Sequence, residues 1–186
     1  MKTILICDNE TVTRKNLKAM LACLGFDNVI ECKNGKSAVE MALASFPDMA
    51  VLDASMPEMD GITAATAIRN KLKIPIILMS KSYDGQTVKR AVECKIAALL
   101  NKPLRKDDLL PAIELAIAHN EEVEELKETI EDLKETIENR KVIEKAKGLL
   151  MEKGHIGEAE AYRLMQKLAM DKRKTLKQIA DGILKN

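Results

Sequence analysis

A chain of 186 residues with a hydrophobic content of 46% can build one large domain or two small ones, and an aromatic content of 2% requires an aliphatic, methionine-rich core. The net charge of +1 is unevenly spread: residues 120–139 carry a net −7 and residues 140–186 a net +6, so the basic tail is expected to meet a polyanion. No apolar run could cross a membrane, and Asp8 and Glu10 interrupt the segment where a signal peptide would need apolar residues, so we expect a cytoplasmic protein.

Short apolar runs alternate with helical segments throughout residues 1–119. The runs expected to form strands are 3–7, 29–32, 49–52, 74–79 and 97–100. Helices are expected at 12–24, where Gly25 is placed to cap the end, and at 35–44. This alternation implies a parallel sheet with helices on both faces. The cysteines have no C-x-x-C spacing and are expected to be reduced and buried: Cys7, Cys23, Cys32 and Cys94.

Four polar residues each fall just past the end of a different strand: Asp8, Asp53, Ser80 and Lys102. The carboxyl ends of parallel strands share one edge of the sheet, so we expect these side chains to lie close together. Two neighbouring carboxylates repel each other, and a divalent cation relieves that repulsion. A lysine neutralises a phosphoryl group, and a serine hydroxyl hydrogen-bonds one of its oxygens. The pattern predicts a carboxylate that accepts a phosphoryl group, and no enzyme site beyond it.

Together these residues resemble the receiver domain of two-component response regulators. The resemblance is carried by Asp8-Asn9-Glu10, Asp53, Met56-Pro57-Glu58-Met59-Asp60-Gly61, Ser80 and Lys102-Pro103. It covers residues 1–119 and implies a flavodoxin-like fold with five parallel strands in the order 2-1-3-4-5. It also implies phosphorylation by a partner histidine kinase.

Carried over by position, the resemblance makes Asp53 the phosphoacceptor, and Ser80 and Lys102 the groups that sense its phosphoryl group. The Mg²⁺ ligands that it implies are Asp8, which would act through water, Asn9, Asp53 and the backbone carbonyl of Ser55.

Three residues depart from the receiver pattern. Asn9 stands where most receivers have a second acid, so one metal ligand has lost its charge and weaker Mg²⁺ binding is expected. Lys81 stands at the mouth of the site, where a small residue is usual. Leu99 occupies the switch position, in place of the aromatic side chain that usually swings inward with the serine or threonine. An alternative interpretation is therefore a pseudo-receiver that takes no phosphate and acts through contact with a partner protein.

One long helix is expected from Asp107 or Asp108, either of which can cap it, to Lys153, with Pro111 in its first turn. Within it, residues 120–139 contain LKETIED followed by LKETIEN. One apolar stripe occupies heptad positions a and d: Val123, Leu126, Ile130, Leu133 and Ile137. β-Branched residues at a with leucine at d favour two parallel strands, so we predict a dimerisation coil. The alternative is an amphipathic helix on its own domain, but the stripe is narrow for that packing.

Three helices are expected in residues 140–186. The long helix ends at Gly154, a second spans 158–170, and a third begins after Thr175, which has capping-box spacing, and ends near Leu184. The core that they would enclose is small: Leu150, Met151, Leu164, Leu168, Ile179 and Ile183.

Residues 140–186 are also similar to the ANTAR output domain of RNA-binding antiterminators. The similarity rests on Ile143-Glu-Lys-Ala-Lys-Gly-Leu-Leu-Met151, Glu160-Ala-Tyr162, Ala169-Met170 and Ile179-Ala180. It implies recognition of paired hairpins in a nascent leader RNA, which prevents a terminator from forming. The arrangement of receiver, coil and ANTAR resembles regulators of ethanolamine or nitrogen-compound use.

The RNA-binding residues are predicted on two grounds. The resemblance implies Lys147 and Gly148, whereas positive charge alone suggests Arg163, Lys172, Arg173 and Lys174. Tyr162 either stacks on an unpaired base or lies in the core.

The leading hypothesis is a regulator that dimerises when Asp53 is phosphorylated and then binds two hairpins with its two basic heads. The rival is a DNA-binding response regulator, which requires a recognition helix with base-reading side chains. The third helix of the tail offers only Lys177, Gln178 and Asp181 for that role.

Overall fold

The computed structural model describes residues 2–185, which fall into two units. The first unit ends at Val123 and the second begins at Glu124, and each has buried apolar side chains of its own. Helix α5 (Lys106–Gly154) contributes residues to both. The first and last residues of the predicted domains, positions 1 and 186, lie outside the described residues. In the part of the chain that is described, no helix is long and apolar enough to cross a membrane.

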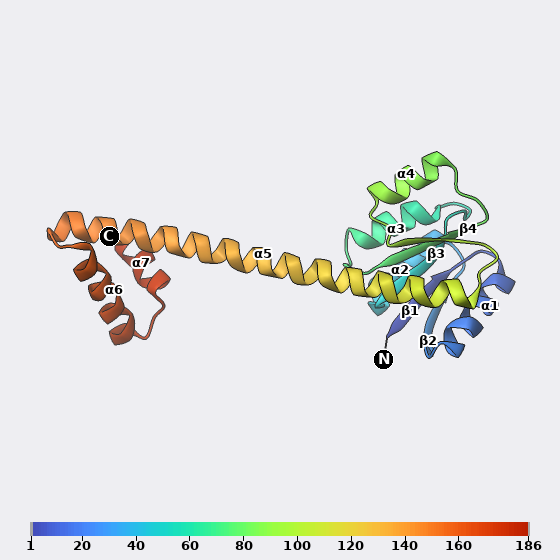
Figure 1. Cartoon of the computed structure of the whole chain (residues 1–186), viewed down its shortest axis with the longest axis horizontal. Helices are drawn as coiled ribbons and strands as arrows, with labels where there is room; N and C mark the ends of the chain where they lie inside the picture. The colour runs from blue at the N-terminus through green and yellow to red at the C-terminus, as the bar shows by residue number, and fades with distance from the viewer. Residues whose placement is uncertain (1, 186) are drawn as a thin grey trace. The chain divides into compact units, whose positions relative to one another are not determined.

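The first unit contains a parallel sheet in the order β2-β1-β3-β4-β5, which confirms the predicted flavodoxin-like topology (Figure 1). Its strands are β1 (Thr3–Cys7), β2 (Asn28–Cys32), β3 (Met49–Asp53), β4 (Ile76–Ser80) and β5 (Ala98–Asn101). The helices that connect them are α1 (Thr11–Cys23), α2 (Gly35–Ser45), α3 (Gly61–Arg69) and α4 (Gly85–Glu93). Because each neighbouring pair of strands is parallel, all the carboxyl ends meet at one edge.

Side chains along each strand alternate between two apolar layers, one on each face of the sheet. In β1, Leu5 packs with α2, α3 and α4, whereas Ile4 and Ile6 pack with α1 and the first turns of α5. Both layers are continuous along β3 and β4, whose residues are all buried. Burial on both faces is the reason that these strands read as unbroken apolar runs in the sequence.

The predicted starts of strand β4 and of helix α5 are wrong, and proline explains the first of these differences. Strand β4 begins at Ile76, not at residue 74, because Pro75 has no N–H to contribute to the ladder. Helix α5 begins at Lys106, so the two predicted capping aspartates lie inside its first turn and Pro111 lies beyond that turn. The aspartates are still favourable there, since negative charge stabilises a helix N-terminus.

The prediction that all four cysteines are buried is also wrong. Cys7 and Cys32 are buried, but Cys94 is only partly buried and Cys23 is exposed. Helix α1 buries Leu21, and a residue two positions later points to the opposite side of a helix.

The second unit packs the end of α5 against α6 (Glu158–Lys172) and α7 (Leu176–Leu184). Its buried side chains include Met165 and Ile179. The predicted core residue Leu164 is exposed. Ala161 and Met165, four residues apart, lie on the buried face of α6, and Leu164 lies outside that face. The capping box at Thr175 is present as predicted.

Candidate functional site

The carboxyl edge of the sheet gathers the four polar side chains that follow its strands. Asp8 comes directly after β1, Asp53 and Ser80 are the last residues of β3 and β4, and Lys102 comes directly after β5. Asp8 is completely buried, and Asp53 and Ser80 are each only 5% exposed. Burying two carboxylates costs free energy unless each has a cation or a hydrogen-bond donor as its partner. The chemistry of this edge therefore depends on those partners.

Lys102 joins the two carboxylates. Its Nζ lies 2.5 Å from Oδ2 of Asp8 and 2.8 Å from Oδ2 of Asp53. Burial works against the charged ammonium, but the hydrogen bonds and charges of Asp53 and Asp8 outweigh it and raise the pKa of Lys102. Lys102 therefore remains a cation that two carboxylates share.

The remaining oxygens of this edge have the chemistry that Mg²⁺ prefers. Oδ1 of Asp8 accepts a hydrogen bond from the Glu10 N–H at 2.7 Å, and Oδ1 of Asp53 accepts one from the Ser55 N–H at 3.2 Å. The Asn9 side chain is exposed beside them in sequence. Among the described residues no three His, Cys, Asp or Glu side chains gather to hold a metal. The predicted ligand set, with two carboxylates, an amide and a backbone carbonyl, still fits Mg²⁺, which needs only one or two protein carboxylates.

The hydroxyl of Ser80 is engaged within its own loop. Its Oγ donates to the Ser82 carbonyl at 2.8 Å and accepts from the Ser82 N–H at 3.4 Å. The predicted phosphate-sensing serine thus lies at the site with its proton directed to the loop. Contact with a phosphoryl oxygen on Asp53 requires that the Ser82 bond break.

A tyrosine that the sequence reasoning missed lies next to the predicted switch position. Leu99 is partly buried against the apolar layer under α2, α3 and α4. Three residues after Ser80, the hydroxyl of Tyr83 contacts the carbonyl of Leu78 at 3.1 Å and that of Leu100 at 2.7 Å, so it bridges β4 and β5. Burial raises the pKa of Tyr83 to about 12. The sequence contained one indication of this role, because Tyr83 is an aromatic residue only three positions after the predicted serine.

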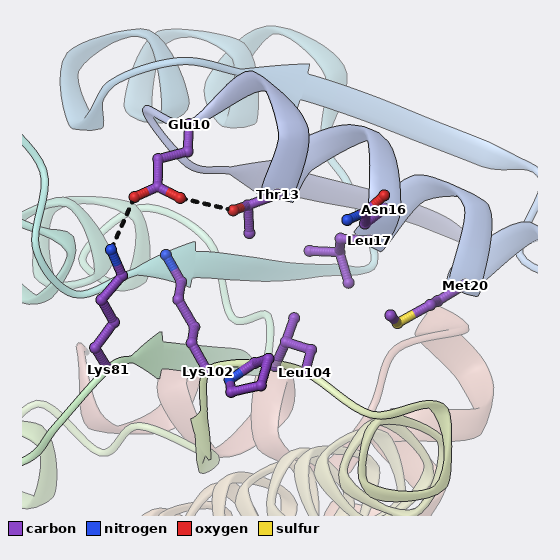
Figure 2. Close-up of a pocket in the computed structure, with 9 residues that line it drawn as sticks. Glu10, Thr13, Asn16, Leu17, Met20, Lys81, Lys102 and Leu104 are labelled. Atoms are coloured by element: carbon purple, nitrogen blue, oxygen red, sulfur yellow. Dashed lines mark hydrogen bonds and ion pairs between the residues drawn. The ribbon is translucent and has the colours of Figure 1, made fainter.

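Lys81, which directly follows Ser80, forms an ion pair with Glu10. Nζ of Lys81 lies 3.0 Å from Oε1 of Glu10, and this pair links the segment after β4 to the segment before α1 (Figure 2). A cavity of about 360 Å³ beside it is lined by α1 side chains and by Lys102 and Leu104. The hydrogen bond from Lys81 lowers the pKa of Glu10, so the Glu10 carboxyl is ionised at neutral pH. Lys81 thus lines the same cavity as Lys102, and its place at the mouth of the phosphorylation site stays a prediction.

Gly61, the last residue of the predicted motif, packs directly on the backbone of Asp53. A Cβ added to Gly61 would lie 2.1 Å from the Asp53 carbonyl oxygen and 2.8 Å from its carbon. Because both are backbone atoms, a larger residue must displace the end of β3. We expect Gly61→Ala to lower the free energy of unfolding of the first unit by about 1–3 kcal/mol. Urea unfolding followed by circular dichroism measures this.

The matched control is Gly85→Ala, where an added Cβ would meet nothing within 4 Å. We expect its effect to stay within about 0.5 kcal/mol. Equal unfolding midpoints for the two variants would contradict the role of Gly61.

The predicted dimerisation stripe is exposed in the single chain. Its four members after Val123 are each 51–56% exposed: Leu126, Ile130, Leu133 and Ile137. Three lysine–glutamate pairs repeat every seven residues along the same helix, at Glu124–Lys127, Glu131–Lys134 and Glu138–Lys141. The stripe is thus an apolar face without cover from the described part of its own chain, which disfavours packing on its own domain.

The two residues that the ANTAR resemblance implies lie in different surroundings. Lys147 is only 8% exposed, and its Nζ lies 2.6 Å from Glu144 and 2.8 Å from Glu158. These hydrogen bonds raise the pKa of Lys147, whose charge is compensated within the unit. Gly148 is exposed, and a Cβ there would meet nothing. The Lys147–Glu158 ion pair thus links α5 to the first turn of α6. At Gly148 the surface of α5 is accessible, because no side chain in the described part of the unit covers it.

The remaining predicted RNA residues are exposed cations: Arg163, Lys172, Arg173 and Lys174. The structure places Lys172 and Lys174 around one cavity with Lys153, which the sequence reasoning had not singled out. Lys153 lies in the last turn of α5, and a basic residue at the end of that helix was the indication in the sequence. Tyr162 is exposed, which excludes the core alternative and leaves stacking open.

Comparison with known families divides the chain into two matches. Residues 4–114 match the response regulator receiver domain, and residues 131–184 match the ANTAR domain. The transcriptional regulatory protein PdtaR of Mycobacterium tuberculosis is 38% identical over 183 residues, which cover 98% of this chain and 89% of PdtaR. The chemotaxis protein CheY of Bacillus subtilis is 36% identical over 111 residues, which cover 59% of this chain and 92% of CheY.

Solved structures match over the first unit. The signal receiver domain of a modulated diguanylate cyclase from Desulfovibrio desulfuricans superimposes with a TM-score of 0.61 and 30% identity, covering 65% of this chain and 97% of that domain. The receiver domain of a NarL response regulator from Mycobacterium tuberculosis gives a TM-score of 0.57 and 28% identity, covering 62% and 95%.

Proposed function

This chain belongs to the response regulators that join a receiver domain to an ANTAR domain, and we propose that it is an antiterminator whose RNA binding is controlled by phosphorylation of Asp53. The observation that carries the proposal is the buried cluster of Asp8, Lys102 and Asp53 in a chain whose second part matches an RNA-binding family. Neither family is a family of enzymes, and the relative PdtaR is itself a transcriptional regulator.

The proposed chemistry is transfer of a phosphoryl group from a histidine of a sensor kinase. An oxygen of the Asp53 carboxylate attacks the phosphorus, the phosphorus–nitrogen bond breaks, and the imidazole leaves with the electron pair. Lys102 already lies 2.8 Å from Asp53 and would neutralise part of the added charge. Mg²⁺ held by Asp8, Asn9, Asp53 and the Ser55 carbonyl would offset the charge of the carboxylates and the phosphoryl group.

Ser80 supplies the proposed signal. Its hydroxyl donates to the Ser82 carbonyl in the described state, and a phosphoryl oxygen is a stronger acceptor than a carbonyl. Phosphorylation would therefore draw the hydroxyl from Ser82 toward Asp53 and rearrange the segment between β4 and α4. That rearrangement changes the surface on which two receivers would pair.

The exposed stripe of α5 supplies the proposed dimer. It covers little more than two heptads, from Val123 to Ile137, and so short a coil is marginally stable alone. Pairing of phosphorylated receivers would raise the local concentration of the two helices and drive them together. Two ANTAR domains would then bind two hairpins of one nascent transcript, which places the protein in the cytoplasm.

The proposed division of the chain is a receiver at 1–119, a coil at 120–139 and an ANTAR domain at 140–186. The ANTAR match begins at residue 131, inside the proposed coil. The last part of the coil would thus serve both dimerisation and the RNA-binding domain, which couples the two physically.

A second candidate function is control by protein contact without phosphorylation. The amide at Asn9 and the Lys81–Glu10 ion pair favour it, because both reduce what the site offers to a metal and a phosphoryl donor. The intact Asp8–Lys102–Asp53 cluster favours phosphorylation.

RNA binding is tested by a mobility-shift titration of the phosphorylated protein. The probes are an RNA with two hairpins, an RNA with one hairpin and a DNA duplex of equal length, each across a salt series. We expect the two-hairpin RNA to bind about 100-fold more tightly than the one-hairpin RNA, since its second contact is intramolecular. DNA should bind weakly and lose affinity steeply with salt. A DNA duplex that binds as tightly as the RNA would contradict the proposal.

A further inference from the structure

The second unit contains a cavity that the proposed function has not used. It has a volume of about 340 Å³ and is formed by α5, α6 and α7 together. Its apolar side chains include Leu168, Ile179 and Ile183, which also pack in the core of the unit. A volume near the lower end of the range for small-ligand pockets suits one flat group and is too small for a helix or a duplex.

Three ammonium groups surround this apolar surface. Lys153, Lys172 and Lys174 line the cavity, and none of its lining residues is acidic. Within residues 2–185, none of these three lysines takes part in an ion pair, whereas Lys147 nearby in sequence is held by two carboxylates. The cavity therefore offers uncompensated positive charge around an apolar surface, which matches a group that is apolar and flat but attached to phosphates.

We propose that this cavity receives one unpaired nucleobase from a hairpin loop, with the three lysines on the adjoining phosphates. The inference rests on the proposed RNA-binding function and adds the subsite to it. A base turned out of a stack is commonly held between apolar side chains, and aliphatic ones must serve here because no aromatic residue lines the cavity. The lysine contacts position the backbone, and the cavity selects an unpaired base over a paired one.

Two further residues fit a base. Gly182 lines the cavity from inside α7, and a Cβ there would meet nothing within 4 Å, so the chain's own packing does not require glycine. Glycine inside a helix is unfavourable, and an open glycine on a cavity wall allows a ligand to approach the backbone closely. Gln178 uses Oε1 to accept from the Thr175 N–H at 3.0 Å, which leaves its amide N–H groups to donate to a base edge.

Gly182→Leu and Gln178→Glu test the inference in the full-length phosphorylated protein. The leucine side chain would fill the cavity without breaking the helix, and glutamate keeps the capping box while replacing the amide donor by a negative charge. Each variant is expected to bind the two-hairpin RNA at least about ten-fold more weakly than the wild type. The control is Gly157→Leu, since Gly157 also has open space around it but lies outside the cavity. Circular dichroism and the oligomeric state should be unchanged in all three.

The RNA is varied in parallel, with an abasic nucleotide placed at each unpaired loop position in turn. At one loop position, we expect the abasic RNA to bind the wild type at least about ten-fold more weakly than the intact RNA does. At that position, Gly182→Leu should bind the abasic and the intact RNA equally. Equal losses for both proteins at every position would overturn the subsite while leaving RNA binding intact. If the wild type bound no hairpin RNA, both the function and the subsite would fail. Thermal stabilisation by free nucleoside monophosphates that Gly182→Leu abolishes, without any abasic effect, would assign the cavity to a free nucleotide and overturn the proposal.

Discussion

Replacing Asp53 by alanine is expected to abolish labelling of the protein by radioactive acetyl phosphate in the presence of Mg²⁺. Asp53 is the buried carboxylate at the end of β3, and its Oδ2 already lies 2.8 Å from the Lys102 ammonium. The other carboxylate at that edge, Asp8, is completely buried and is held by the same lysine and by the Glu10 N–H, so it cannot substitute. Labelling should be acid-stable and base-labile, as for an acyl phosphate.

The matched control is Glu58→Gln, which removes an exposed carboxylate from the same segment after β3. Its labelling should equal that of the wild type. If the wild type and Asp53→Ala were equally unlabelled, phosphorylation would be the wrong mechanism and control by a partner protein would replace it. If Asp53→Ala kept its label, the phosphoacceptor would be another residue.

Disrupting the apolar stripe of α5 is expected to have the largest effect on RNA binding. In the double variant Ile130→Gln with Leu133→Gln, two side chains that are more than half exposed in the single chain become polar. Glutamine is a good helix former, so the helix should persist while its apolar face is lost. We expect the phosphorylated protein to sediment as a monomer and to lose about 10²–10⁴-fold in affinity for the two-hairpin RNA. Its affinity for a single hairpin should change little.

The same residue introduced on the opposite face provides the control. Glu128→Gln with Glu135→Gln changes two exposed positions seven residues apart, both remote from the stripe. This variant should remain a dimer when phosphorylated. A monomeric control, or a dimeric stripe variant with full RNA affinity, would contradict the proposed coil. If the unphosphorylated wild type were already a tight dimer, phosphorylation would not control dimerisation.

The place of the candidate phosphorylation site could be predicted because it depends on topology. A residue that follows a parallel strand reaches the carboxyl edge whatever its neighbours are, so Asp8 and Lys102 meet although 94 positions separate them. The strand order was implied by the resemblance to receiver domains, and the apolar runs of β1, β3 and β4 agree with it because these three strands lie in the interior of the sheet. The heptad stripe is a local pattern, and one helix is enough to display it.

The sequence did not predict correctly which side chains are buried or paired with a charge where this depends on contacts between helices. Leu164 and Met165 are adjacent apolar residues on α6, and only its packing against α5 and α7 decides that Met165 is buried. Lys147 carries the charge that an RNA site needs, yet Glu158 from the next helix compensates it.

The order of residue types is therefore enough to predict the two families of domains, the strands with the polar residues at their ends and the apolar stripe, because all of these follow from periodicity and motif. The packing of the elements against one another was needed to show that the Ser80 hydroxyl donates to Ser82, that Tyr83 bridges two strands and that three lysines line a cavity formed by three helices. A hydrogen-bond partner or a cavity wall is set by distances of a few ångströms between segments that are far apart in sequence, and no local pattern of residue types encodes those distances.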